Sequence, residues 1–238
     1  GLAGRGRRGQ ATAQLPTLMQ RAAVQARLPR TLFSAFVDAV KQQGRRTRIV
    51  EDIRQIEESY GTVLKATLAL ARLLARCSKQ DEIVGVMLPN TVAAVATLFG
   101  LSARKRVPAM LNYSSGPDAV RSSVQAAGIR TVVTSRRFVE SAHLERLLRA
   151  LEGCTIHYLE DLRSQLALSD KLWLACWALW RPRSIEREPD PHGLAIVLFT
   201  SGSEGKPKGV GITHDAVLAN MAQIAAAIDF NESDKFLN

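Results

Sequence analysis

The sequence predicts an α/β fold in which helices lie on the faces of a layered, largely parallel sheet. Short β-branched runs alternate with helical stretches along most of the chain, as in strands joined by crossover helices. The chain has 238 residues, 46% of them apolar, which is enough to bury a core. No apolar run approaches the roughly 20 residues of a membrane-spanning helix. The sequence therefore predicts a globular α/β domain.

The first elements precede this alternation. We expect short helices over Leu18–Leu28 and Leu32–Val40, then a brief strand over Arg48–Val50. From Tyr60 to Ala75 apolar residues recur at i, i+4, i+7 and i+11, which predicts a helix with one buried face.

Four pairs, each a strand followed by a helix, come next. They are Ile83–Met87 with Val92–Ser102, Val107–Leu111 with Pro117–Ala127, Thr131–Thr134 with Arg137–Leu151, and Thr155–Leu159 with Asp161–Trp180. A proline-rich stretch, residues 181–193, then separates this unit from a last apolar strand, Leu194–Phe199.

The segment after this strand has the composition of a phosphate-binding loop. Glycines at 202, 205 and 209 permit positive φ and close backbone approach, so that successive N–H groups can converge on an anion. Thr200, Ser201 and Ser203 add hydroxyl donors, and lysines add positive charge. This combination suits a polyphosphate.

The loop differs from a Walker A motif, which has four residues between its glycines and Ser or Thr after its lysine. Here Pro207 follows Lys206, and the apolar run Val210–Ile212 suggests that the chain returns in a second strand. A helix then begins, with Thr213 as N-cap and Asp215 in its first turn. The residues that share one face of this helix are Val217, Met221, Ile224 and Ile228.

Residues 197–208 resemble the signature loop of the AMP-forming acyl, aryl and peptide adenylating enzymes. The resemblance implies the N-terminal portion of the large domain of such an enzyme, with ATP and Mg²⁺ as cofactors. It implies that the β- and γ-phosphates are held by Thr200, Ser201, Gly202, Ser203 and Gly205, with Lys208 as the signature lysine. Lys206 falls where the family tolerates many residues.

Further segments are similar to one bacterial subgroup, the bifunctional acyl–acyl carrier protein synthetases and acylglycerophosphoethanolamine acyltransferases. They are Glu204 in SEG, MLPN at 87–90, VPAMLNY at 107–113, TSRRF at 134–138 and YLEDL at 158–162. This resemblance implies a fatty acid as substrate, acyl carrier protein or CoA as acceptor, and a lysophospholipid as final acceptor through an acyltransferase. It also implies a bacterial cytoplasmic location at the inner membrane.

The resemblance divides the chain into a basic linker, residues 1–28, which would end an absent acyltransferase region, and the adenylation domain, residues 29–238, with its phosphate loop at 197–209. No histidine is followed, after four intervening residues, by an Asp, the pair expected of the acyltransferase. The family's ribose-binding, magnesium-binding and catalytic lysine positions are expected beyond Asn238. We therefore expect a fragment that is inactive alone, and its catalytic residues are unknown.

The charge of +10, from 32 basic and 22 acidic residues, favours anionic partners without choosing among them. A nucleic-acid-binding module is one alternative, but aromatic residues are only 5% and no RNA-binding or helix-turn-helix signature is present. A noncatalytic nucleotide-binding remnant or subunit is another. Three widely spaced cysteines indicate neither a disulfide framework nor a zinc site.

Two features keep alternative interpretations. Thr213 and His214 together match a pair of residues that is common in the family. Alternatively, His214 is a solvated residue at the start of a helix. Trp173, Trp177 and Trp180 lie at i, i+4 and i+7, which places them on one helical face. That face is either core or an interfacial surface, with the tryptophans at headgroup depth and Lys171, Arg181 and Arg183 near anionic lipid.

Overall fold

The computed structural model describes residues 31–51, 57–200 and 207–228. The helix expected at Leu18–Leu28 and the basic linker lie outside these ranges. The elements run in the order α2 (Leu32–Gln43), β1 (Arg48–Glu51), β2 (Glu57–Ser59), α3 (Tyr60–Cys77), β3 (Ile83–Val86), α4 (Val92–Ala103), β4 (Val107–Met110), η1 (Tyr113–Ser115), α5 (Pro117–Ala127), β5 (Thr131–Thr134), α6 (Arg136–Ser141), α7 (Glu145–Ala150), β6 (Thr155–Tyr158), α8 (Leu159–Ser164), α9 (Leu168–Trp173), η2 (Leu174–Ala178), η3 (Pro182–Ile185), β7 (Leu194–Thr200), β8 (Lys208–Thr213) and α10 (His214–Ala227).

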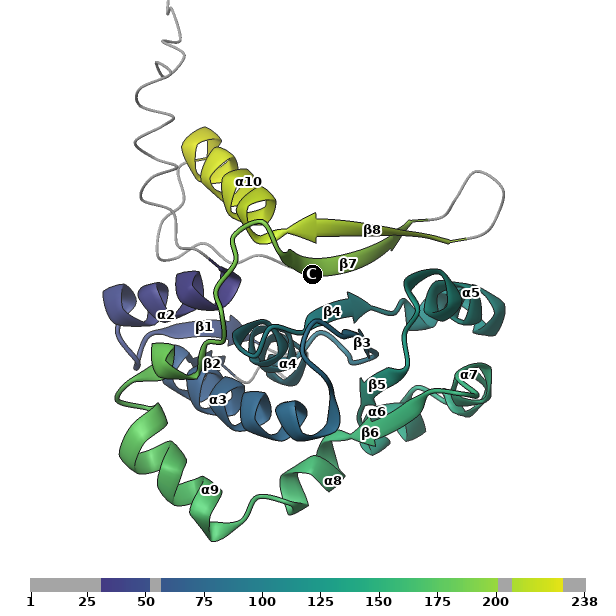
Figure 1. Ribbon diagram of the computed structural model, residues 1–238, viewed down its shortest axis with the longest axis horizontal. Coiled ribbons are helices and arrows are strands. Elements are labelled where there is room, and N and C mark those ends of the chain that lie inside the picture. Colours follow the sequence, from purple (N-terminus) through teal and green to yellow (C-terminus); the bar gives the residue numbers. More distant parts are fainter. Residues whose placement is uncertain (1–30, 52–56, 201–206, 229–238) are drawn as a thin grey trace, which may run out of the picture.

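A mixed six-stranded sheet with strand order β6-β5-β3-β4-β7-β8 forms the centre (Figure 1). Strands β3 to β7 are parallel to their neighbours, and β8 alone runs antiparallel, beside β7. A separate antiparallel pair joins β1 to β2, a short strand that the sequence did not predict. The predicted α/β class with helices on its sheet is confirmed.

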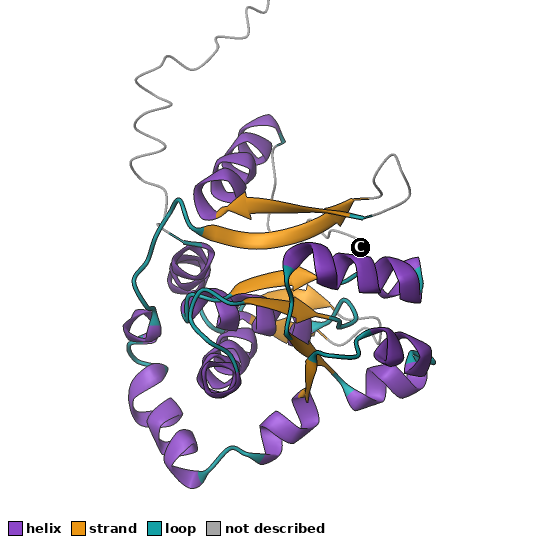
Figure 2. Cartoon of the chain, turned by 45° about the vertical axis from the view of Figure 1, so that its right-hand side comes forward, coloured by secondary structure: helices purple, strands orange, loops and turns teal. Residues whose placement is uncertain are grey.

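Helices cover both faces of the sheet (Figure 2). Val132 packs with residues of α5, α6 and α7, whereas the next residue, Val133, packs with residues of α3, α4 and α8. This alternation follows from the pleat, which turns successive side chains to opposite faces. A strand buried on both faces needs the continuous apolar sequence seen here.

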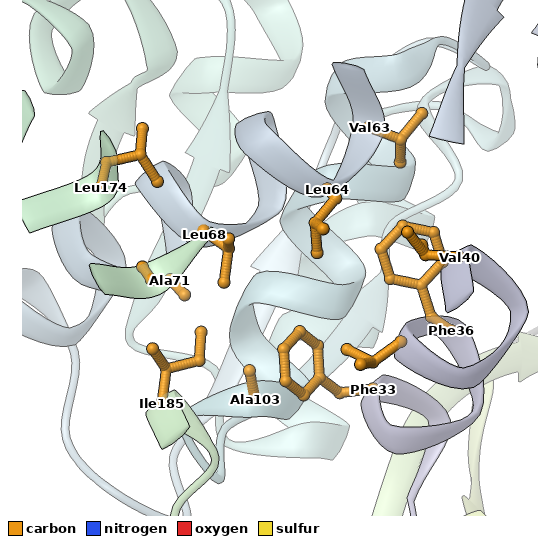
Figure 3. Close-up of a cluster of buried hydrophobic side chains, with 12 residues drawn as sticks. Phe33, Phe36, Val40, Val63, Leu64, Leu68, Ala71, Ala103, Leu174 and Ile185 are labelled. Carbon is orange, nitrogen blue, oxygen red and sulfur yellow. The ribbon is translucent and has the colours of Figure 1, made fainter. Parts of the chain in front are cut away.

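Helix α3 joins two of the hydrophobic clusters. Its residues Leu64, Leu68 and Ala71 face α2 and the segment around Leu174 (Figure 3), while Leu73 and Leu74 face the sheet. Helix α4 approaches it closely at Gly100, where an added Cβ would lie 3.1 Å from the backbone nitrogen of Ala71. Glycine therefore permits this helix contact.

Two predicted helices are interrupted. The expected helix Arg137–Leu151 is α6 and α7, because His143 adopts a left-handed φ of 52° between them. That turn allows both Val139 and Leu147 to reach the same cluster. The expected helix Asp161–Trp180 is α8, α9 and a π-helical turn, η2.

Asp170 explains where α9 begins. Its carboxylate accepts a hydrogen bond from the N–H of Ala167 at 3.2 Å. It also forms ion pairs with Arg72 at 2.5 Å and Arg76 at 2.6 Å, both on α3. Asp170 is buried, and the two guanidinium groups hold its pKa well below the ordinary value of 3.8. The inward face of this segment is thus formed by Asp170, Leu174 and Ala178, and of the three tryptophans only Trp173 packs against the same cluster.

The apolar face predicted for α10 exists but is only partly covered. Of its four residues, Val217 is partly buried, whereas Met221, Ile224 and Ile228 are 55%, 44% and 51% exposed. The buried apolar residue of the helix is Leu218, which lies outside the predicted face. Within the described ranges no helix is long and apolar enough to cross a membrane.

We predict that Asp170→Asn lowers the free energy of unfolding at neutral pH. The variant should then lose less stability than the parent chain when the pH is lowered. A carboxylate with a depressed pKa stabilises above its ordinary pKa, and this contribution is lost as the pH falls through the folded pKa. Urea unfolding from about pH 7 to about pH 2 measures both effects. Asp118→Asn, at an exposed pair with Arg121, is the matched control and should change little. An equal response of both variants would contradict the assignment.

Candidate functional site

The segment predicted to bind phosphate forms a β-hairpin at the edge of the sheet. β7 pairs with β8 in an antiparallel register that ends with Thr200 opposite Lys208. The predicted return of the chain in a second strand is therefore confirmed, and the strand is longer than the expected Val210–Ile212. Figure 1 shows β7 and β8 side by side at the edge of the sheet.

The parallel pairing of β7 with β4 fixes the position of the hairpin. Ala109 pairs with Val197, so β7 points in the same direction as β4 and its carboxyl end lies at the carboxyl edge of the sheet. Phe199 packs in the same cluster as Tyr113 and Val120, which anchors the end of β7 above the start of α5. Ligands of open α/β sheets bind outside the carboxyl ends of strands.

The structure places two of the predicted site residues and brings them together. Thr200 and Lys208 are both exposed and lie opposite each other at the base of the connecting loop. The other predicted residues, Ser201, Gly202, Ser203 and Gly205, lie outside the described residues, as does Lys206. Gly209 differs from expectation: it lies within β8 opposite Phe199 and does not have positive φ.

The chemistry of this pair fits an anion. A threonine hydroxyl can donate a hydrogen bond and the lysine ammonium supplies a compact positive charge on a flexible stem. The ammonium cannot bind a metal ion, and a single neutral hydroxyl does not by itself make a magnesium site. In the described part of the chain no group of three His, Cys, Asp or Glu residues could hold a metal ion. The pair thus fits the phosphate groups of a nucleotide, and these residues provide no magnesium site.

Two hollows lie at the opposite, amino edge of the sheet. One, of about 690 Å³, is lined by residues that include Ile83, Thr131 and Thr155, the first residues of β3, β5 and β6. The other, of about 80 Å³, is lined by residues that include Val107, Leu194 and His214. Neither borders Thr200 or Lys208.

His214 connects the hairpin to the rest of the domain. It begins α10 directly after β8, is only 7% exposed, and its Nδ1 accepts a hydrogen bond from the backbone N–H of Leu32 at 3.2 Å. This bond requires an unprotonated Nδ1, and burial lowers the pKa of the imidazole below 6.5 against the opposing effect of Glu186. The alternative of a solvated helix start is therefore wrong. Thr213 and Asp215 occupy the N-cap and first turn as predicted.

A polar cluster lies at the start of α2, beside the hydrogen bond between Leu32 and His214. The carboxylate of Glu186 accepts hydrogen bonds from the hydroxyls of Thr31 and Ser34, the latter at 2.8 Å. Thr31 in turn caps α2 by accepting from the N–H of Ser34. The sequence contains no signal for this cluster, because Glu186 is more than 150 residues away from Thr31 and Ser34 along the chain.

Other polar residues also have partners far from them in the sequence. Arg106 is 8% exposed and donates to the carbonyls of Ala75 and Ser78. His192 is exposed, and its Nδ1 lies 2.9 Å from a carboxylate oxygen of Asp215. The thiols of Cys77 and Cys154 have pKa values raised by burial, which disfavours the reactive thiolate.

We predict that His214→Leu lowers the free energy of unfolding at neutral pH by about 1 to 3 kcal/mol, because the buried N–H of Leu32 loses its acceptor. In the parent chain, a His pKa lowered by folding makes stability fall as the pH drops below 6.5 through the folded pKa. His214→Leu should remove this contribution. Urea unfolding at neutral pH and at about pH 5 measures both effects.

His192→Leu is the control for this comparison, since His192 is exposed and its removal should change stability little. Equal losses in the two variants would show that His214 does not anchor the hairpin.

Comparison with known proteins gives the family. The model for "AMP-binding enzyme" matches residues 36–238. Indigoidine synthase of Dickeya dadantii (strain 3937) is 28% identical over 184 residues, which cover 75% of this chain and 11% of that protein. 4-Coumarate–CoA ligase 2 of Oryza sativa subsp. japonica is 24% identical over 149 residues, covering 59% of this chain and 26% of the ligase. The chain thus spans a small part of these relatives.

Solved structures show the same fold. VinN in complex with 3-methylaspartate superposes with a TM-score of 0.66 at 22% identity, over 84% of this chain and 52% of that one. ATP-bound MatB from Rhodopseudomonas palustris superposes with a TM-score of 0.62 at 18% identity, over 84% and 38%.

The family model thus covers the hairpin and the parallel sheet that positions it. The match extends over most of the chain, from α2 to residue 238. The chain belongs to the AMP-binding enzyme family.

Proposed function

We propose that the β7–β8 hairpin holds the β- and γ-phosphates of ATP in an enzyme that activates a carboxylic acid as its acyl-adenylate. One observation carries this proposal: Thr200 and Lys208 face each other across the strand pair at the carboxyl edge of the sheet, in a chain of the AMP-binding family. The family's ligases form adenylates, which supports an acid–thiol ligase. ATP and an acid are then the expected substrates.

The chemistry assigns an electrostatic role to the hairpin. A carboxylate oxygen of the acid attacks the α-phosphorus of ATP, the new oxygen–phosphorus bond forms, and the bond to the bridging oxygen breaks, so that pyrophosphate leaves with the electron pair. Lys208 would offset the charge that develops on this leaving group, and Thr200 would orient it through its hydroxyl. No base is needed, since the acid is already ionised at neutral pH.

Mg²⁺, when bound with ATP, neutralises phosphate charge in the same reaction. Magnesium is usually held by one or two carboxylates together with substrate phosphates, and Thr200 and Lys208 supply no carboxylate. The site built here is therefore one part of a larger site.

We further propose a fatty acid as the acid, acyl carrier protein or CoA as the thiol, and a lysophospholipid as the final acceptor. The support is the sequence resemblance of residues 87–90, 107–113, 134–138 and 158–162 to the bacterial subgroup. Residues 87–90, 111–113 and 135–138 directly follow β3, β4 and β5, so these segments gather at the carboxyl edge that also carries the hairpin. A location at the bacterial inner membrane belongs to the same proposal.

A noncatalytic nucleotide-binding subunit is the second candidate. It rests on the same hairpin, because Thr200 and Lys208 can contact phosphate without a reaction taking place. Both candidates use the hairpin for phosphate, so they differ in catalysis rather than in nucleotide binding.

We predict that the chain binds ATP and pyrophosphate weakly and in a salt-sensitive manner, and that Lys208→Ala weakens binding by roughly tenfold to a hundredfold, the value of one charged hydrogen bond. Lys206→Ala, which removes the same charge two residues away, should have a smaller effect. Calorimetry at two salt concentrations measures this. Equal losses in the two variants would indicate general charge attraction and refute the role of Lys208.

We predict that the 238-residue chain alone shows no fatty-acid-dependent exchange of labelled pyrophosphate into ATP, because Thr200 and Lys208 account only for the phosphate contacts of the reaction. Binding of ATP without exchange is the expected result. Exchange above background would show that the chain already contains a complete adenylation site. Absence of ATP binding would refute both candidate functions.

A further inference from the structure

A peripheral segment of the domain exposes large apolar side chains to solvent. We call it the outer ridge and define it as residues 168–180, which comprise α9, η2 and the turn that follows. Both overall views place α9 at the periphery, away from the β7–β8 hairpin (Figures 1 and 2). The large apolar side chains that the ridge exposes, with their exposed fractions, are Leu168 at 72%, Leu172 at 56%, Trp177 at 48% and Trp180 at 79%.

The inner side of the ridge is already packed and held in place. Leu174 and Ala178 are buried in the cluster that also contains Leu64 and Leu68 of α3 (Figure 3). Asp170 is fixed by its two ion pairs, described above, and the carbonyl of Leu179 accepts a hydrogen bond from Arg45. The exposed apolar residues are therefore not the side of the segment that packs in the core, because Leu174 and Ala178 form that side.

The three tryptophans do not share one environment. Trp173 is half-buried, packs against the core, and lies under the guanidinium of Arg72 at 4.6 Å from the ring centroid. Trp177 donates from Nε1 to the hydroxyl of Ser184 at 3.1 Å and keeps about half its surface exposed. The core interpretation thus holds for Trp173, and Trp177 and Trp180 remain available to a partner.

The charge around the ridge is positive. Residues 163–183 contain four basic residues, Arg163, Lys171, Arg181 and Arg183, and a single acidic residue, Asp170. Asp170 is buried and neutralised by Arg72 and Arg76. The fold adds a fifth cation, since Arg45 reaches the carbonyl of Leu179 from the end of α2. Arg183 forms an ion pair with Asp38, so it contributes less than the others.

We propose that the outer ridge is an interfacial site that docks on anionic membrane lipid. Leucine and tryptophan side chains on a fixed helix can enter the headgroup boundary, where the amphipathic indole ring is favoured. Flanking lysine and arginine side chains interact with anionic headgroups. Neither of the two hollows described above includes a ridge residue. The proposal is independent of the chemistry of the hairpin.

The test uses the 238-residue chain with vesicles of phosphatidylcholine, with and without about 30% phosphatidylglycerol. Co-sedimentation gives the partition coefficient, and tryptophan emission in a Trp173→Phe background reports Trp177 and Trp180 alone. We expect binding and a blue shift with anionic vesicles only, both reduced by salt. Leu172→Ser should weaken partition by roughly tenfold and Lys171→Gln by roughly fivefold.

Ile224→Ser is the matched control, because Ile224 is also an exposed apolar residue but lies on α10, away from the ridge. Unfolding curves of each variant establish that it remains folded. Loss of partition in the ridge variants with retention in Ile224→Ser supports the proposal. It is overturned by absence of vesicle binding, by equal loss in Ile224→Ser, or by ridge-dependent binding of a small acidic carrier protein in the absence of vesicle binding.

Discussion

The packing of α3 against α4 is the contact on which the remainder of this domain depends. Gly100 lets the two helices approach until backbone lies against backbone, so both can lie on one face of the sheet. From this position α3 reaches the strands with Leu73 and Leu74 and the ridge segment with Leu64 and Leu68. One helix thus supports both the sheet that carries the hairpin and the outer ridge.

The hairpin depends on two connections to this scaffold. The parallel pairing of Ala109 with Val197 sets its direction. The hydrogen bond from the N–H of Leu32 to His214 ties the end of β8 to α2. A site that must place a lysine beside a phosphate needs such support, because loop residues are less rigid than the elements that carry them. The neutral imidazole is suited to this task because it can accept from a backbone N–H and remain buried without charge.

The positive charge of the chain has several separate uses in the structure. Arg72 and Arg76 form ion pairs with the buried Asp170, and Arg106 donates to a backbone carbonyl. These three cations therefore give no indication of a partner. Lys208 at the hairpin and Lys171 on the ridge are exposed and can meet anions. A net charge of +10 is therefore a poor guide to function until each cation is placed, since buried and paired charges are counted with free ones.

The sequence by itself determined the α/β class and placed strands β3 to β7 to within about one residue, because β-branched runs and helical periodicity are local signals. It also placed Thr213 as the N-cap of α10. Only the tertiary structure decided that Thr200 faces Lys208, that His214 is buried against Leu32, and that the segment Asp161–Trp180 breaks where Asp170 meets Arg72 and Arg76. These outcomes depend on contacts between residues far apart in the chain, and a local pattern contains no information about which distant group will neutralise a buried charge or occupy a helix face.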